Sequence, residues 1–278
     1  MNAISTHCDH EDWRLLGWIG IWSLAFLVVI ASLLKLTSTL DDLTDDSRFV
    51  LGFAMGGLAV TWTAAATWAA LIHLPSASDP TRQRVRSRIA VAVIGIVEIV
   101  YLGWMSRPYS SLFVEAVLST MVATAGPILV WQWTRRRIHR TEQVVSHRRK
   151  IRHLMEMTFI IAIIAAVLNW GCRWPEISTT KLVVIVSNAF VWTFVLSVIL
   201  GRWWPSAVLA IPILISQLVV SASLVESMGQ AGDGQIEQNA GTILGFHFFT
   251  FLLLILMRSS NHRWIGSEKK YELSSSPN

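Results

Sequence analysis

The stretch LLGWIGIWSLAFLVVIASLL, residues 15–34, carries no charged side chain and is bounded by Arg14 and Lys35. A helix needs about 20 predominantly apolar residues to cross the hydrocarbon core of a bilayer. Residues 1–12 contain no Lys or Arg, whereas a secretory signal peptide has a basic leader and a shorter apolar core. The stretch therefore predicts a retained membrane-spanning helix from Arg14 to Leu36.

Seven further apolar blocks follow along the chain. Because lipid offers the backbone no hydrogen-bond partners, each block predicts a helix that satisfies its own amides and carbonyls. The predicted spans are Phe49–Leu74, Ile89–Ser106, Tyr109–Trp133, Leu154–Gly171, Lys181–Leu200, Pro205–Ser227 and Gly241–Met257. Gly201 and Pro205 favour separate sixth and seventh helices, because glycine can end a helix and proline fits its first position.

The composition agrees with a membrane protein. Of 278 residues, 53% are hydrophobic and 15% are charged, where a soluble domain carries roughly 25% charged residues. The mean hydropathy is +0.50. These values exclude a soluble enzyme, a disulfide scaffold and a disordered chain, and the block length excludes an outer-membrane barrel, whose strands alternate over ~10 residues. The expected fold class is all-α, a polytopic transmembrane bundle of eight helices with short loops and no soluble domain.

Basic residues predict the orientation of the bundle, because short cytoplasmic loops are enriched in Lys and Arg. With eight spans, 18 of the 23 Lys and Arg residues fall on the side that holds both termini and the loops 75–88 and 134–153. The sequence thus predicts one transmembrane domain, residues 14–258, between two cytoplasmic tails, residues 1–13 and 259–278. The second tail is polar, which predicts disorder.

The second inner loop is the most basic segment of the chain. Its side chains are expected to contact anionic lipid headgroups, at ~1 kcal/mol per basic residue. The residues concerned are Arg135, Arg136, Arg137, Arg148, Arg149 and Lys150. No nucleic-acid-binding motif accompanies them, so nucleic acid is not an expected partner.

The start of the fifth span carries a resemblance. The sequence Arg152-His153-Leu154-Met155-Glu156-Met157-Thr158, which runs into an Ile/Ala-rich segment, resembles a helix opening in uncharacterised bacterial multi-pass membrane proteins. It covers the segment Arg152–Gly171. The resemblance implies a location in the bacterial inner membrane and implies no activity.

Two spans carry stripes of small or polar residues at helical spacing. Small residues on one face allow helices to approach closely in a membrane. The stripe in span two comprises Gly52, Gly56, Ala59, Thr63, Ala66 and Ala70, and that in span four comprises Ser111, Glu115, Ser119 and Gly126. Both stripes predict helices in the interior of the bundle.

Five polar side chains lie within the predicted spans, between the midplane and the outer leaflet: Glu98, Glu115, Asn188, Gln217 and His247. An acidic residue at a helix centre costs ~2.5–3.5 kcal/mol on insertion scales. One interpretation is a polar pocket linked to a proton or cation, with Glu98 as the coupling group and Gln217 or Tyr101 as its hydrogen-bond partner. The alternative is that these side chains hold the helices together.

No catalytic, metal or cofactor site is predicted. The chain lacks H-E-x-x-H, G-x-S-x-G, a P-loop and G-x-G-x-x-G. The ligand-type residues His7–His10 and Asp41–Asp46 lack a convincing second set of ligands in the sequence. Cys8 and Cys172 fall on opposite sides of the membrane and cannot pair.

Two functions remain. One is a small permease for a solute or ion, coupled through Glu98. The other is a non-catalytic scaffold or sensor subunit, whose basic inner loops dock a membrane partner or a second copy of the chain. A water-accessible cavity at Glu98 would favour the permease, and a tightly packed interior would favour the subunit.

Overall fold

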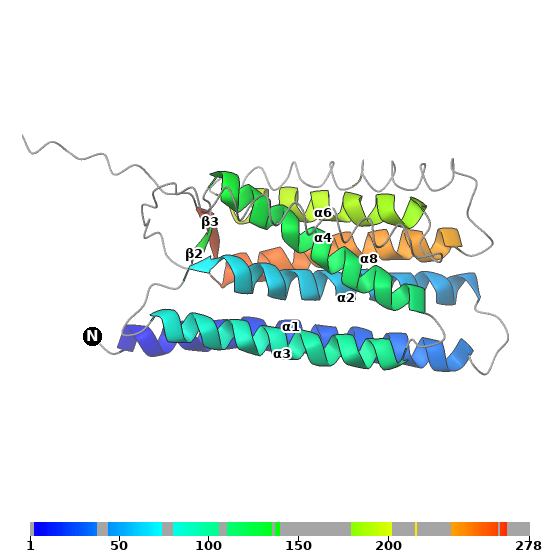
Figure 1. Ribbon diagram of the computed structural model, residues 1–278, viewed down its shortest axis with the longest axis horizontal. Coiled ribbons are helices and arrows are strands. Elements are labelled where there is room, and N and C mark those ends of the chain that lie inside the picture. Colours follow the sequence, from blue (N-terminus) through cyan, green and yellow to red (C-terminus); the bar gives the residue numbers. More distant parts are fainter. Residues whose placement is uncertain are drawn as a thin grey trace, which may run out of the picture.

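The computed structural model describes residues 3–37, 44–73, 80–105, 110–134, 137–139, 179–201, 215, 235–260 and 262–265. This part of the chain contains six helices (Figure 1): α1 Ala3–Thr37, α2 Asp45–Leu71, α3 Pro80–Met105, α4 Ser110–Thr134, α6 Thr179–Ile199 and α8 Gln235–Ser259. The spans predicted at Leu154–Gly171 and Pro205–Ser227 lie outside the described residues. The eight-helix count therefore stays a prediction.

Five of the described helices are long and apolar enough to cross a membrane. They lie in α1, α2, α4, α6 and α8, and α3 has a shorter apolar part, Gly95–Trp104. The first half of α3 carries the arginines of the first predicted inner loop, which shortens its apolar run. The chain is therefore an α-helical, multi-pass membrane protein.

The helices form a layered bundle around a central pair. Figure 1 shows α2 and α8 in the middle, α1 and α3 on one side of them, and α4 and α6 on the other. Gly52 of α2 lies against Gln238 near the start of α8, and Trp68 of α2 bonds to His262 beyond the end of α8. α2 and α8 are therefore parallel. α4 and α6 run in the same direction as this pair, and α1 and α3 run in the opposite direction.

Four glycines set the close approach of α2 and α8. A Cβ atom on Gly52 or Gly56 would overlap a backbone carbonyl oxygen of α8, and one on Gly241 or Gly245 would overlap a carbonyl oxygen of α2. The prediction that the Gly52 stripe lies inside the bundle is confirmed, because most of α2 is buried. The matching Gly241-x-x-x-Gly245 pair on α8 is not among the sequence predictions.

Three short strands join the helices at one end of the bundle. β1 Ile72–His73 pairs in parallel with β2 Arg137–His139, which pairs antiparallel with β3 Arg263–Ile265. They follow α2, α4 and α8, so the sheet ties three helix ends together where α1 begins (Figure 1). This end, here called the basic end, is the predicted cytoplasmic side. The all-α prediction does not include this sheet.

Buried polar side chains complete the hydrogen bonding at the basic end. The Trp68 indole donates to Nε2 of the fully buried His262 at 3.2 Å, and His262 Nδ1 lies 3.1 Å from the carbonyl of Met257. Arg258 donates to the carbonyls of Ile199 and Gly201. The last carbonyls of a helix have no partner within it, so Arg258 satisfies the end of α6.

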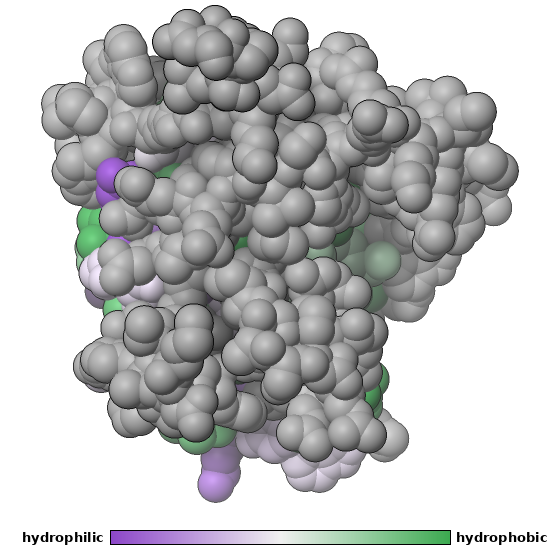
Figure 2. Space-filling view, turned by 90° about the vertical axis from the view of Figure 1, so that its left-hand side faces the viewer, coloured by the Kyte–Doolittle hydropathy of each residue, from purple (hydrophilic) through white to green (hydrophobic). Residues whose placement is uncertain are grey.

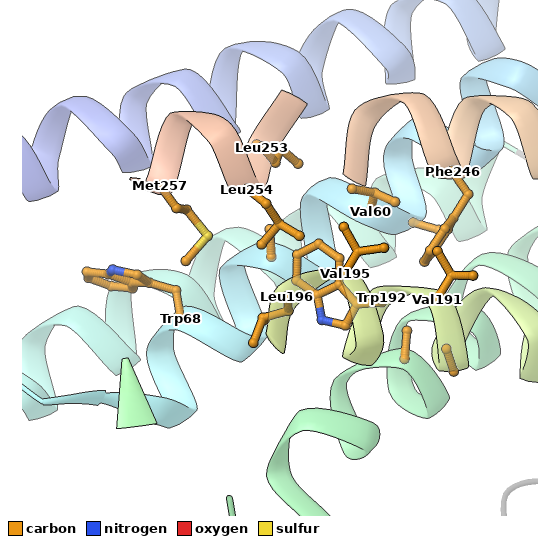
Figure 3. Packing of buried hydrophobic residues seen from close by; sticks show 14 of the residues in the cluster. Val60, Trp68, Val191, Trp192, Val195, Leu196, Phe246, Leu253, Leu254 and Met257 are labelled. Carbon is orange, nitrogen blue, oxygen red and sulfur yellow. The ribbon is translucent and has the colours of Figure 1, made fainter. Parts of the chain in front are cut away.

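The largest apolar cluster of the described residues extends over α1, α2, α4, α6 and α8. Figure 3 shows Trp192 of α6 among Val195, Leu196 and Leu254, with Trp68 and Met257 farther along. Trp192 is fully buried, and its indole donates to Thr67 Oγ1 of α2 at 3.2 Å. In the view from the basic end, the few described residues that are visible are both hydrophobic and hydrophilic (Figure 2). Large hydrophobic side chains of α1 and α3, such as Ile21, Leu24, Ile96 and Val100, are exposed, which suits helices that face lipid.

Candidate functional site: a carboxyl group in a bilayer-side cavity

Glu98 is held by side chains from two other helices. Ser23 of α1 donates to Glu98 Oε2 at 2.7 Å, and the Trp62 indole of α2 donates to the same oxygen. The Trp62 indole also lies 3.1 Å from Ser23 Oγ, so its single hydrogen is shared between the two acceptors. Ser23 and Trp62 are buried, and Glu98 is half-buried. The carboxyl group thus links α1, α2 and α3.

The partners of Glu98 differ from those that the sequence suggests. Tyr101 is 43% exposed and its ring lies 6.4 Å from that of Trp104, tilted by 42°, so its prediction as the partner of Glu98 is wrong. Gln217, the other predicted partner, lies outside the described residues. The depth of Ser23 in the membrane could have identified it as a partner. At ~1.5 Å per residue, Ser23 and Glu98 lie at about the same distance from the inner ends of their predicted spans, Arg14 and Ile89.

A cavity of about 290 Å³ extends from Glu98 between α1, α2, α3 and α4. Its walls are almost wholly apolar. The lining residues are Leu16, Ile19, Gly20, Ser23, Trp62, Ala65, Ala66, Ala92, Gly95, Ile96, Glu98, Ile99, Val117, Thr120 and Met121. Small residues keep the space open, because a Cβ atom on Gly20 or Gly95 would meet nothing within 4 Å.

The two carboxyl oxygens of Glu98 have different environments. Both hydrogen bonds, from Ser23 and from Trp62, go to Oε2, and Oε1 accepts none from the part of the chain that the structure describes. An oxygen that already accepts two hydrogen bonds is the poorer place for a proton, so the neutral acid carries its proton on Oε1. Glu98 is the only titratable residue among the described residues that line the cavity, so a proton bound there would lie on Oε1.

A second polar cluster lies between α2, α4, α6 and α8. Lys181 Nζ lies 3.1 Å from Glu115 Oε2, and both residues are buried. Glu115 and Asn188 border a void of about 10 Å³, together with Ser119 and Thr242. Neither polar atom of the Asn188 side chain has a hydrogen-bond partner among the described residues. A void of this size has room for about one water molecule, which would need two or more polar partners.

The other predicted residues fall elsewhere. His247 is buried on α8, with Nδ1 2.5 Å from the carbonyl of Ile243 and Nε2 unpartnered among the described residues. The predicted polar set is therefore divided between the Glu98 cavity, the Glu115 cluster and an isolated His247. Of the six basic residues expected at the headgroups, Arg137 lies in β2 and the other five lie outside the described residues.

Fold and site together define a multi-pass α-helical membrane protein with a carboxyl group in an apolar cavity. Comparisons of the chain with protein-family models, curated proteins and solved structures find no match.

Proposed function

We propose that the protein is a small permease that couples movement of a solute to protonation of Glu98. The observation that carries the proposal is the cavity itself: about 290 Å³ of open space ends at a carboxyl group inside a bundle of apolar helices. A scaffold subunit needs no such space. Protein interiors are otherwise close-packed, so space of this size beside a carboxyl group gives room for a small occupant.

The hydrogen bonds of Glu98 support a proton-exchanging role. Ser23 and Trp62 stabilise Oε2 in both protonation states, because both donate to it whether or not Oε1 carries a proton. Charging the carboxyl group then requires no rearrangement of its protein partners. The remaining requirement is compensation of the negative charge at Oε1, which a bound solute can supply.

The direction of the helices supports the predicted eight spans. α4 and α6 are parallel, as are α6 and α8, so each connecting segment must return across the bundle. The apolar blocks at Leu154–Gly171 and Pro205–Ser227 have the length to do so. With these two crossings the N-terminus and the C-terminus share the basic end, which is cytoplasmic in a bacterial inner membrane by the distribution of Lys and Arg.

The proposal is tested in proteoliposomes that contain a pH-sensitive dye, with the membrane potential clamped. Gradients of three small solutes are imposed: benzyltrimethylammonium, neutral neopentylbenzene and phenylmethanesulfonate. At least one gradient should drive proton movement with the wild type and with the matched control Tyr101→Phe, and none should do so with Glu98→Gln. Proton movement that persists in Glu98→Gln, or that no solute evokes in the wild type, overturns the proposal.

A further inference from the structure

The walls of the Glu98 cavity select for an apolar body. Branched aliphatic side chains from two helices, such as Ile19 of α1 and Ile96 and Ile99 of α3, face the space together with alanines and glycines. A hydrated polar solute would lose its water there without new partners, at a cost of several kcal/mol. The volume of about 290 Å³ lies near the lower limit of small-molecule sites, which span roughly 300–1,000 Å³. The occupant is therefore small and largely apolar.

The polar end of the cavity selects for positive charge. Glu98 is the only ionisable residue among the described residues of the lining, and its partners Ser23 and Trp62 already donate to Oε2. An ionised carboxylate with Oε1 uncompensated in an apolar space is unstable, and a cation beside Oε1 removes that penalty. An anion would be repelled, and a neutral molecule would leave the charge uncompensated.

One side of the Glu98 cavity is exposed at the surface of the bundle. Ile96 of α3 and Met121 of α4 line the space, yet they are 61% and 44% exposed. Farther along α3, Gly103 lies against the ring of Phe113 of α4, so the two helices touch beyond Ile96. At the level of Ile96 and Met121 the space has an exposed side, and in a bilayer that side faces lipid.

We infer that the substrate is a small amphipathic organic cation that reaches Glu98 from within the bilayer, past the exposed side of α3. This inference rests on the proposed permease function and specifies its substrate class. The apolar body fills the space between Ile19 and Ile99, and the charged group lies at Glu98 Oε1. A proton and the cation compete for that oxygen, so each displaces the other, and this competition is the coupling.

The inference is tested by binding to purified protein in phosphatidylcholine nanodiscs, with empty nanodiscs as the blank. Radiolabelled benzyltrimethylammonium is compared with neopentylbenzene, which has the same shape and no charge. The cation should bind saturably and at least about tenfold more tightly than its neutral counterpart, a difference of 1.4 kcal/mol. Glu98→Gln should remove this preference, and Tyr101→Phe, on the exposed side of the same helix, should keep it.

A second variant tests the location of the bound cation. Gly95→Leu places a side chain into open space and should abolish binding, while Gly17→Leu, also beside open space but outside the lining, should not. Equal binding of neopentylbenzene, or cation binding that survives both Glu98→Gln and Gly95→Leu, overturns the inference. If the neutral or anionic solute alone drives Glu98-dependent proton movement in proteoliposomes, the permease proposal stands and the cation inference fails. A fluorescence-monitored gel-filtration profile identifies a variant that does not fold, and Ala92→Leu then replaces Gly95→Leu.

Discussion

The contact between α2 and α8 provides a sharp test of the packing, through the substitution Gly56→Ala. The added Cβ atom would overlap the carbonyl oxygen of Thr242 and lie 2.7 Å from the amide nitrogen of Phe246. Both atoms belong to the α8 backbone, so no side-chain rotation relieves the overlap. The two helices must move apart along their whole contact.

The expected loss can be estimated from overpacking. Inserting a methyl group into a well-packed interior costs typically ~1–3 kcal/mol. Here the contacts of all four glycines between α2 and α8 are weakened together. Gly20→Ala is the matched control, because it is the same chemical change in a helix with nothing within 4 Å of the new atom. Helix propensity alone favours alanine over glycine by about 1 kcal/mol. Gly20→Ala should therefore be neutral or mildly stabilising.

The assay is reversible unfolding in mixed detergent micelles, followed by circular dichroism, for the wild type and both variants. Gly56→Ala should lower the free energy of unfolding by about 1–3 kcal/mol, and Gly20→Ala should not lower it. Equal effects of the two substitutions would refute the reasoning, because propensity rather than close approach would then govern both sites.

Three further outcomes are expected from the second polar cluster and from the topology. Lys181→Met should cost ~3–5 kcal/mol in unfolding free energy, because Glu115 is left buried and unpaired; adding Glu115→Leu should recover much of that loss, and a double variant as unstable as the single one would contradict the pairing. Asn188→Leu should raise the unfolding free energy by about 1 kcal/mol, because it removes a buried amide without partners; a loss in the same measurement would indicate that a bound water or ion satisfies Asn188. Reporter fusions after Asp45 should be active outside the cytoplasm and those after Arg88 inside it; the reverse pattern would invert the orientation.

Hydropathy predicts where helices cross the membrane but not where they end. α1 is predicted from Arg14 and begins at Ala3, and α2 is predicted from Phe49 and begins at Asp45. The apolar run marks only the part of a helix that lies in hydrocarbon, and hydrogen bonding continues into the polar headgroup region. The sheet that follows α2, α4 and α8 escapes prediction for another reason, since its strands of two or three residues are too short to show alternation.

The sequence alone does not determine how each helix at the site is rotated about its own axis. Glu98 stands out because a carboxyl group is costly within a span, but its partner depends on which way α3 turns. Tyr101 is one turn away along the chain and points elsewhere, whereas Ser23 and Trp62 are distant in sequence and meet Glu98. Placing a hydroxyl or indole group in a membrane costs little free energy. Ser23 and Trp62 therefore look like ordinary packing residues in the sequence.

The packing holds α2 firmly and α3 loosely. α2 is fixed by its glycine contact with α8 and by the bond from Trp68 to His262, and it presents Trp62 to the cavity from a rigid position. α3 is held less closely, because Ile96 and other apolar side chains from Ile89 to Trp104 are exposed, and Glu98 links it to α1 and α2 through Ser23 and Trp62. A change of charge at Glu98 would therefore act on the helix that is least constrained by packing among those that the structure describes. This is the helix whose displacement would widen or close the exposed side of the cavity.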